Sequence, residues 1–119
     1  MSEPLSPCPW FPFGCVSSLN DAWSFCRVEP FAVSGDPHAA FARLKNLVSR
    51  TASTVIVTAT DDYLHATCRS RAGYIDDLEC RLCPTGRVIH IRSAARNGIW
   101  DLCVNRRRVQ RLRRQFQSE

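Results

Sequence analysis

Tyr63-Leu-His-Ala-Thr-Cys-Arg-Ser70 and, after a short turn, Tyr74-Ile-Asp-Asp-Leu-Glu-Cys-Arg-Leu-Cys83 are the stretches that determine the fold of this chain. In both, apolar residues alternate with polar ones, which is the period of a β-strand with one buried face. The intervening Arg71-Ala72-Gly73 is short enough for a tight turn, and strands joined in this way are antiparallel neighbours. We therefore expect a hairpin at the centre of the fold.

Two further strands flank this hairpin. Thr54–Thr60 is rich in β-branched residues and is joined to the hairpin by the turn signal Asp61-Asp62. Arg87–Ala94 follows the turn Pro84-Thr85-Gly86. The short connections predict a four-stranded antiparallel meander.

Alternation divides the predicted strands into two faces. The apolar positions are Leu64, Ala66, Cys68, Leu78, Cys80, Leu82, Ile89 and Ile91. The positions between them are Tyr63, His65, Thr67, Arg69, Asp77, Glu79, Arg81, His90 and Arg92. We expect the first face to pack under helices and the second to be solvated or to bind a ligand.

Two helices are predicted. Asp36 can cap and Pro37 can open a helix that runs to about Arg50. Asp101 can cap a second helix, whose residues Leu102, Asn105, Val109, Leu112 and Phe116 form one stripe with a single amide. The predicted fold class is α+β, with an irregular N-terminal segment, a helix, the meander and a C-terminal helix, and with both helices on one sheet face.

Residues 1–33 form an irregular segment rich in proline and aromatic residues, and residues 34–119 form the α+β domain. With 119 residues, the chain is expected to be a single domain overall. Proline blocks regular pairing, yet aromatic side chains are costly to leave in water. We expect the segment to wrap over the domain. The alternative is that Trp10, Phe11 and Phe13 contact a partner.

The net charge of +5 is concentrated in the last helix, since residues 101–119 carry six arginines against two acids. A helical wheel places Arg107, Arg111 and Arg114 on the side away from the apolar stripe. Arg106 and Arg113 flank the stripe on one edge, and Arg108 flanks it on the other. The outer three are candidates for binding an acidic partner or for simple solvation.

A polar cluster is expected where the last strand meets the last helix. Its members are Asp76, Asp77, Arg92, Arg96, Asp101, Asn105 and Arg106. The favoured interpretation is an ion network that locks helix to sheet, because a buried amide such as Asn105 needs hydrogen-bond partners. The functional alternative is a pocket in which Arg92, Arg96 and Arg106 bind a carboxylate or phosphate.

No catalytic residue, cofactor or metal is predicted. The seven cysteines include only one Cys-x-x-Cys pair, Cys80 and Cys83, and a spacing of three along a strand turns such side chains to opposite faces. His65 and His90 share the polar face with Asp77 and Glu79, but cross-strand charged pairs are commoner than general bases. Reduced thiols are expected, because the N-terminal residues Met-Ser-Glu-Pro lack the basic segment and the apolar run of a secretory signal.

No apolar run approaches the roughly 20 residues that span a bilayer. We therefore expect a soluble protein without a transmembrane segment or signal peptide.

Several motifs carry a family resemblance, in the same order along the chain. They are Cys15-Val-Ser-Ser18, Val28-Glu-Pro30, Thr60-Asp-Asp-Tyr-Leu-His-Ala66, Tyr74-Ile-Asp-Asp-Leu-Glu79, Val88-Ile-His-Ile-Arg-Ser-Ala-Ala-Arg-Asn-Gly98 and Asp101-Leu-Cys-Val-Asn-Arg-Arg-Arg-Val109. From about residue 8 to residue 116 the chain resembles the DUF1499 family, a domain of unknown function. It departs from the family at Cys103, where Gly is usual, and at Ala95, where Ser is common. The resemblance implies a cytoplasmic or plastid/organellar location and supplies no catalytic residue.

Three functions are compatible with these features. The leading hypothesis is a non-enzymatic accessory or protein-interaction domain, working with a protein partner in a larger complex. The second is a small anionic-ligand binder or enzyme that uses the Arg/Asp cluster. The third is a weak electrostatic nucleic-acid binder, which is less favoured because Phe116 lies on the buried stripe rather than beside the outer arginines.

Overall fold

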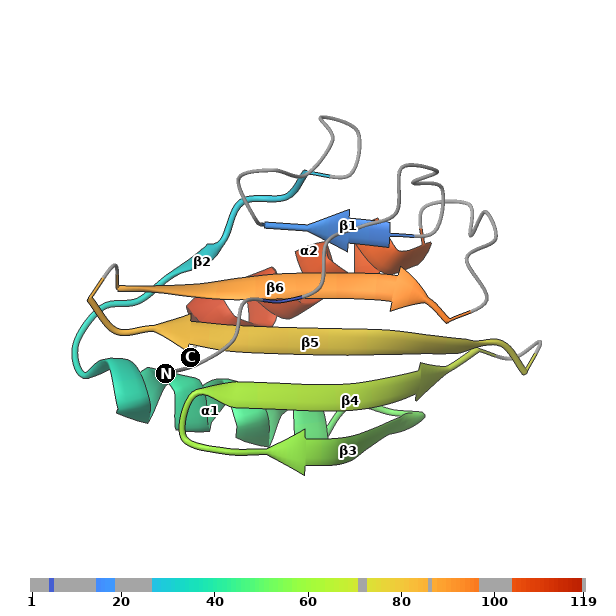
Figure 1. Cartoon of the computed structure of the whole chain (residues 1–119), viewed down its shortest axis with the longest axis horizontal. Helices are drawn as coiled ribbons and strands as arrows, with labels where there is room; N and C mark the ends of the chain where they lie inside the picture. The colour runs from blue at the N-terminus through green and yellow to red at the C-terminus, as the bar shows by residue number, and fades with distance from the viewer. Residues whose placement is uncertain are drawn as a thin grey trace.

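The computed structural model describes residues 5, 15–18, 27–70, 73–85, 87–96 and 104–118. In these ranges the chain forms an antiparallel sheet with two helices packed on one of its faces (Figure 1). The elements in chain order are β1 (Cys15–Ser17), β2 (Phe31–Ala32), α1 (Pro37–Ser49), β3 (Thr54–Ala59), β4 (Tyr63–Arg69), β5 (Ile75–Cys83), β6 (Val88–Ala95) and α2 (Val104–Ser118).

The sheet contains the expected meander and extends beyond it. Its strand order is β1-β6-β5-β4-β3, and β2 also pairs with β6. The meander from β3 to β6 is therefore confirmed, as is the placement of both helices on one face. The added strands come from the segment expected to be irregular: β1 pairs antiparallel with the end of β6, and β2 pairs with its start. At three and two residues, these strands are too short to show a period in the sequence.

Helix α1 begins as its sequence predicts. The Asp36 carboxylate accepts a hydrogen bond from the Ala39 amide at 2.9 Å, which satisfies one of the amides that a helix start leaves open. Pro37 occupies the first turn, where its missing N–H costs nothing. The helix buries Ala40, Phe41, Leu44, Leu47 and Val48. This apolar face fixes α1 behind the sheet (Figure 1).

The core lies between the sheet and the two helices. Buried and partly exposed positions alternate along β4 and β5, and along β6 as far as Ser93. Helix α2 contributes Val109, Leu112 and Phe116, and the Phe116 ring stacks on Phe31 of β2 with their centroids 5.6 Å apart. Burying a large apolar side chain stabilises a fold by about 1.5–3 kcal/mol. The Phe31–Phe116 contact thus ties the N-terminal part of the chain to its last helix.

Candidate functional site

Helix α2 carries six arginines and no acidic residue. Because side chains three and four positions apart share a helix face, the arginines divide into inner and outer groups. The side chains of Arg107, Arg111 and Arg114 are exposed, whereas those of Arg106, Arg108 and Arg113 are half-buried. We call the first three the outer arginines.

Arg108 joins α2 to the helix side of the sheet. Its guanidinium forms an ion pair with Asp76 at 2.9 Å, and Asp76 is buried with 4% of its surface exposed. Arg108 also donates to the Asn105 carboxamide oxygen at 2.7 Å, and the Ser93 hydroxyl donates to the same oxygen at 2.5 Å. The single amide on the apolar stripe is therefore satisfied inside an ion network, which we call the buried network.

Arg106 and Arg113 anchor the other side of α2 to the segment that leads into β2. Arg106 donates to the Arg27 carbonyl at 3.1 Å. Arg113 donates to the carbonyls of Glu29 and Pro30, and its guanidinium lies 4.7 Å from the centre of the Phe31 ring. Burial lowers the pKa of Arg113 from its ordinary value. These two arginines bind the protein's own backbone.

The outer arginines differ from the inner ones in their surroundings. Arg111 and Arg114 make no hydrogen bond or ion pair within the described part of the chain. Exposed glutamines lie near them on the helix, namely Gln110, Gln115 and Gln117. Around Arg111 and Arg114, the outer face of α2 is therefore cationic and carries no counter-charge from the described residues.

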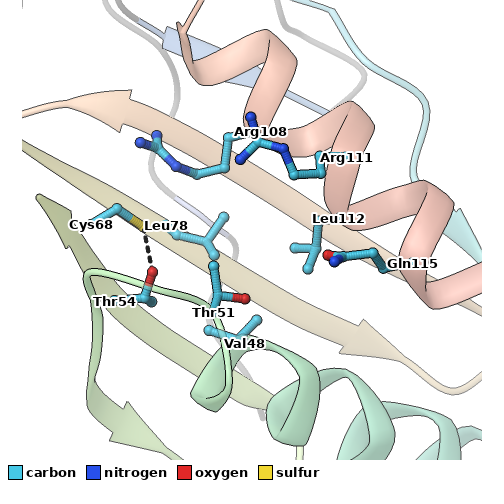
Figure 2. A pocket seen from close by; sticks show the side chains of 9 residues that line it. All are labelled: Val48, Thr51, Thr54, Cys68, Leu78, Arg108, Arg111, Leu112 and Gln115. Carbon is cyan, nitrogen blue, oxygen red and sulfur yellow. Dashed lines mark hydrogen bonds between the residues drawn. The ribbon is translucent and has the colours of Figure 1, made fainter. Parts of the chain in front are cut away.

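Arg111 also lines a small pocket between the helices (Figure 2). Its walls come from α1, α2 and the sheet, and its lining residues are Val48, Thr51, Thr54, Cys68, Leu78, Arg108, Arg111, Leu112 and Gln115. Its volume of about 20 Å³ holds about one water molecule. Small-molecule sites are roughly 300–1,000 Å³ in volume. The pocket is thus a dimple beside the outer arginines and has no room for a substrate.

On the outer face of the sheet, Glu79 and Asp77 each pair with a charged side chain in β6 or directly after it. Glu79 accepts hydrogen bonds from Tyr63 at 2.6 Å and from Arg92 at 3.2 Å. Burial and the hydrogen bond to Glu79 raise the pKa of Tyr63. Asp77 binds the Arg96 guanidinium through both its oxygens, at 2.7 and 3.1 Å, and contacts His65 at 2.8 Å.

The Arg96 hydrogen bond and the His65 contact hold the pKa of Asp77 below its ordinary value despite partial burial.

His90 lies on the same outer face and contacts the end of β1. Its Nδ1 lies 3.0 Å from the Ser18 hydroxyl, whose oxygen accepts the Ile91 amide at 2.8 Å. Burial lowers the pKa of His90. Ser18 is completely buried, so this Ser–His contact offers no accessible nucleophile.

The predicted polar cluster is distributed over three places. Asp76 and Asn105 belong to the buried network, Arg92 and Arg96 lie on the outer sheet face, and Arg106 binds the Arg27 carbonyl. Adjacent strand residues point to opposite faces, which separates Asp76 from Asp77. Arg92, Arg96 and Arg106 do not converge on one point in this arrangement. Asp101 lies outside the described residues, as do Trp10, Phe11 and Phe13.

Two members of the buried network were absent from the predicted cluster. Ser93 continues the alternation of Ile89 and Ile91, so it falls on the buried face of the strand. A hydroxyl at a buried position was the signal in the sequence that could have identified it as a member of the network. Arg108 was placed at the edge of the helical stripe, but the wheel does not say which acid it reaches.

The described cysteines do not form a shared site. Cys80 is fully buried and Cys83 half-buried, and both are free, as is Cys68. Burial raises the pKa of the Cys80 thiol. Cys15 is disulfide-bonded, so the expectation of reduced thiols does not hold for this residue. In the described ranges, no three His, Cys, Asp or Glu side chains are placed to hold a metal ion.

The sequence profile of the family described as "Protein of unknown function (DUF1499)" matches residues 4–116 of the chain. Neither the curated proteins nor the solved structures gave a match. Among the described residues, neither helix is long and apolar enough to cross a membrane.

Proposed function

The chain belongs to the DUF1499 family of proteins of unknown function, and we propose that it is a non-enzymatic protein-interaction domain. Its contact surface is the outer face of α2, formed by the outer arginines and the glutamines near them. The observation that carries the proposal is the contrast within one helix. Arg108 and Arg113 are held by internal acceptors, whereas Arg111 and Arg114 have none in the described part of the chain.

The chemistry of this face favours an acidic protein segment as the partner. Guanidinium groups bind carboxylates through two parallel hydrogen bonds, and neighbouring glutamines can donate and accept further ones. The dimple beside Arg111, walled by Leu112 and Val48, gives such a segment one apolar contact. Buried apolar contacts ringed by polar groups are typical of protein interfaces.

Two features make the alternatives weaker. The outer sheet face, where His65, Asp77 and Glu79 lie, is engaged in cross-strand pairs, and Arg92 and Arg96 are both bound to carboxylates. A nucleic-acid surface commonly adds aromatic side chains for base stacking. On α2 the aromatic residue is Phe116, which is buried against Phe31.

Site-specific photo-crosslinking in living cells tests the proposal. A photoreactive amino acid at Gln110, on the exposed face of α2, should yield a discrete crosslinked protein. The matched control carries the same amino acid at Ala42, which is exposed on α1. Equal crosslinking at both positions, or none at Gln110, would refute a contact through α2.

A further inference from the structure

The free edge of the sheet lies at β3, on the opposite side from β1 and β2. Among the described residues β3 pairs only with β4, and no described element covers its outer edge in Figure 1. Val55 and Val57 are 64% and 56% exposed, and the following residues Thr58 and Ala59 are also exposed. An open edge presents unpaired N–H and C=O groups and is a template for another strand.

The backbone groups that face outward can be assigned from one hydrogen bond. The Arg69 amide donates to the Ser53 carbonyl at 2.9 Å, so these two residues form a hydrogen-bonded pair. Such pairs alternate along an antiparallel ladder. Thr54 and Ile56, which lie opposite Cys68 and Ala66, therefore direct their N–H and C=O groups toward the open edge.

This edge lacks the usual charged protection. Natural edges are commonly blocked by charged residues, proline or bulges. Residues 51–60, Thr-Ala-Ser-Thr-Val-Ile-Val-Thr-Ala-Thr, contain neither a charge nor a proline. The one interruption is a bulge between Ile56 and Thr58, which leaves the residues before it free to pair.

We propose that the β3 edge binds the β3 edge of a second copy of this chain, in an antiparallel pair with a two-fold axis at Val55. Thr54 of each copy then exchanges hydrogen bonds with Ile56 of the other, and the two Val55 side chains face each other. A two-fold interface requires a patch that is complementary to itself, and an antiparallel strand pair meets this condition. The proposal uses a different surface from the α2 contact and does not depend on it.

Charge at the two ends of the strand fits a second copy. Arg69 lies beside the start of β3, and Asp61 follows its end. Both side chains are exposed and make no ion pair within the described part of the chain. In an antiparallel pair, the start of one strand lies toward the end of the other, so the cationic end of each copy approaches the acidic end of its partner.

The second copy would also contact a pocket beside this edge. An open pocket of about 280 Å³ at the start of β3 is lined by residues that include Ser53, Val55 and Arg69. Pairing centred on Val55 brings Val57 of the second copy alongside Ser53, at the rim of this pocket. The contact remains small, below about 1,200 Å² in total, which is the class of weak, transient interfaces. The dimer should therefore form reversibly and at high concentration.

Sedimentation equilibrium of the purified chain tests this pairing. The wild-type chain should show a monomer–dimer equilibrium as its concentration rises toward about 1 mM, where weak association is measurable. Val55→Lys places two like charges directly opposite each other, and should raise the dissociation constant about tenfold or more. The control Tyr74→Lys also replaces an exposed large hydrophobic residue, which is 53% exposed and lies outside β3, and should leave the dissociation constant unchanged.

Disulfide crosslinking between two copies tests which residues of the paired strands face each other. Val55→Cys, oxidised at high concentration, should give a disulfide between the two introduced thiols that is identified by peptide mass spectrometry. Facing residues in a non-hydrogen-bonded pair have Cα atoms about 4.5 Å apart, which is within disulfide range. A wild-type chain that stays monomeric overturns the proposal. In that case the β3 edge is available to pair with a strand of another protein. A dimer that Val55→Lys does not weaken, or one in which Val55→Cys forms no crosslink between copies, also overturns it.

Discussion

At the scale of single residues, the buried network depends on the pair of Asp76 and Arg108. Asp76 lies on the helix face of β5, where the other inward positions of the strand, Leu78, Cys80 and Leu82, are apolar. An unpaired charge at such a place is costly, whereas a paired and hydrogen-bonded one is tolerated. Asn105 and Ser93 complete the set of acceptors around Arg108. The network therefore fixes where α2 lies on the sheet.

Asp76→Asn should destabilise the protein strongly. The variant keeps the shape of the side chain but leaves the Arg108 cation without its counter-charge, and removing one partner of a buried pair costs about 3–5 kcal/mol. Because 18% of the Arg108 side chain remains exposed, we expect a loss of about 2–4 kcal/mol in the free energy of unfolding. Urea denaturation measures it. Asp61→Asn, at an exposed acid, should change stability by less than about 0.5 kcal/mol. Similar losses in both variants would contradict the role of the network.

Asp77 should contribute to the acid sensitivity of the fold. Arg96 and His65 hold its pKa below the ordinary value of about 3.9, so the folded state favours the carboxylate. That stabilisation is fully present above the ordinary pKa, and is lost as the pH falls through the lower pKa of the folded state. Unfolding free energies measured from pH 7 to pH 2 should therefore converge for wild type and Asp77→Asn at the acid end. Curves that stay parallel throughout would contradict this assignment.

At the scale of elements, α2 combines two roles on opposite faces. Its inner arginines bind the sheet and the segment before β2, and its outer arginines face solvent. Neighbouring residues on a helix differ by about 100° in direction, so Arg113 and Arg114 fall on different sides. This adjacent pair allows the structural role to be separated from the surface role.

Arg113→Ala and Arg114→Ala should differ in stability although they delete the same side chain. Arg113 loses its bonds to the Glu29 and Pro30 carbonyls and its contact with the Phe31 ring. Hydrogen bonds from a charged group and a cation–π contact are together worth about 2–3 kcal/mol. Arg114→Ala should cost less than about 0.5 kcal/mol. Thermal and urea unfolding of the two variants measure the difference, and equal costs would contradict the division of the helix.

The elements show how far the sequence leads. Alternation and turn chemistry predict β3 to β6 and their order, because each strand is long enough to show a period of two. The strands β1 and β2 escape prediction because they are set by their pairing with β6 and not by a pattern of their own.

The candidate site was predictable in part. The helical period indicates which arginines of α2 point outward, since direction around a helix follows from position alone. Which acid an arginine contacts depends on how the helix packs on the sheet, and the helical period does not give this. In the structure it is Arg108, rather than Arg106, that pairs with Asp76. The predicted cluster combined Asp76 with Asp77, although neighbouring residues of a strand lie on opposite faces.

At the scale of the whole molecule, the main core lies between the sheet and the helices, and the described residues offer two surfaces on which we have proposed contacts. One is the outer face of α2, which is cationic, and the other is the β3 edge, which is uncharged. They lie on separate elements and have different chemistry. Because the surfaces are separate, the proposed α2 contact and the proposed β3 pairing can be tested independently.

Quantitative affinity capture from native cells, comparing two charge-matched variants, tests the proposed interaction most directly. Arg111→Glu combined with Arg114→Glu reverses the outer face of α2. Arg50→Glu combined with Arg87→Glu makes the same change in net charge at exposed positions outside both proposed surfaces. We predict that the first variant loses the acidic partner that wild type captures, while the second retains it. Retention of that partner by the Arg111/Arg114 variant, at the wild-type level and with the fold intact, would contradict a binding role for α2.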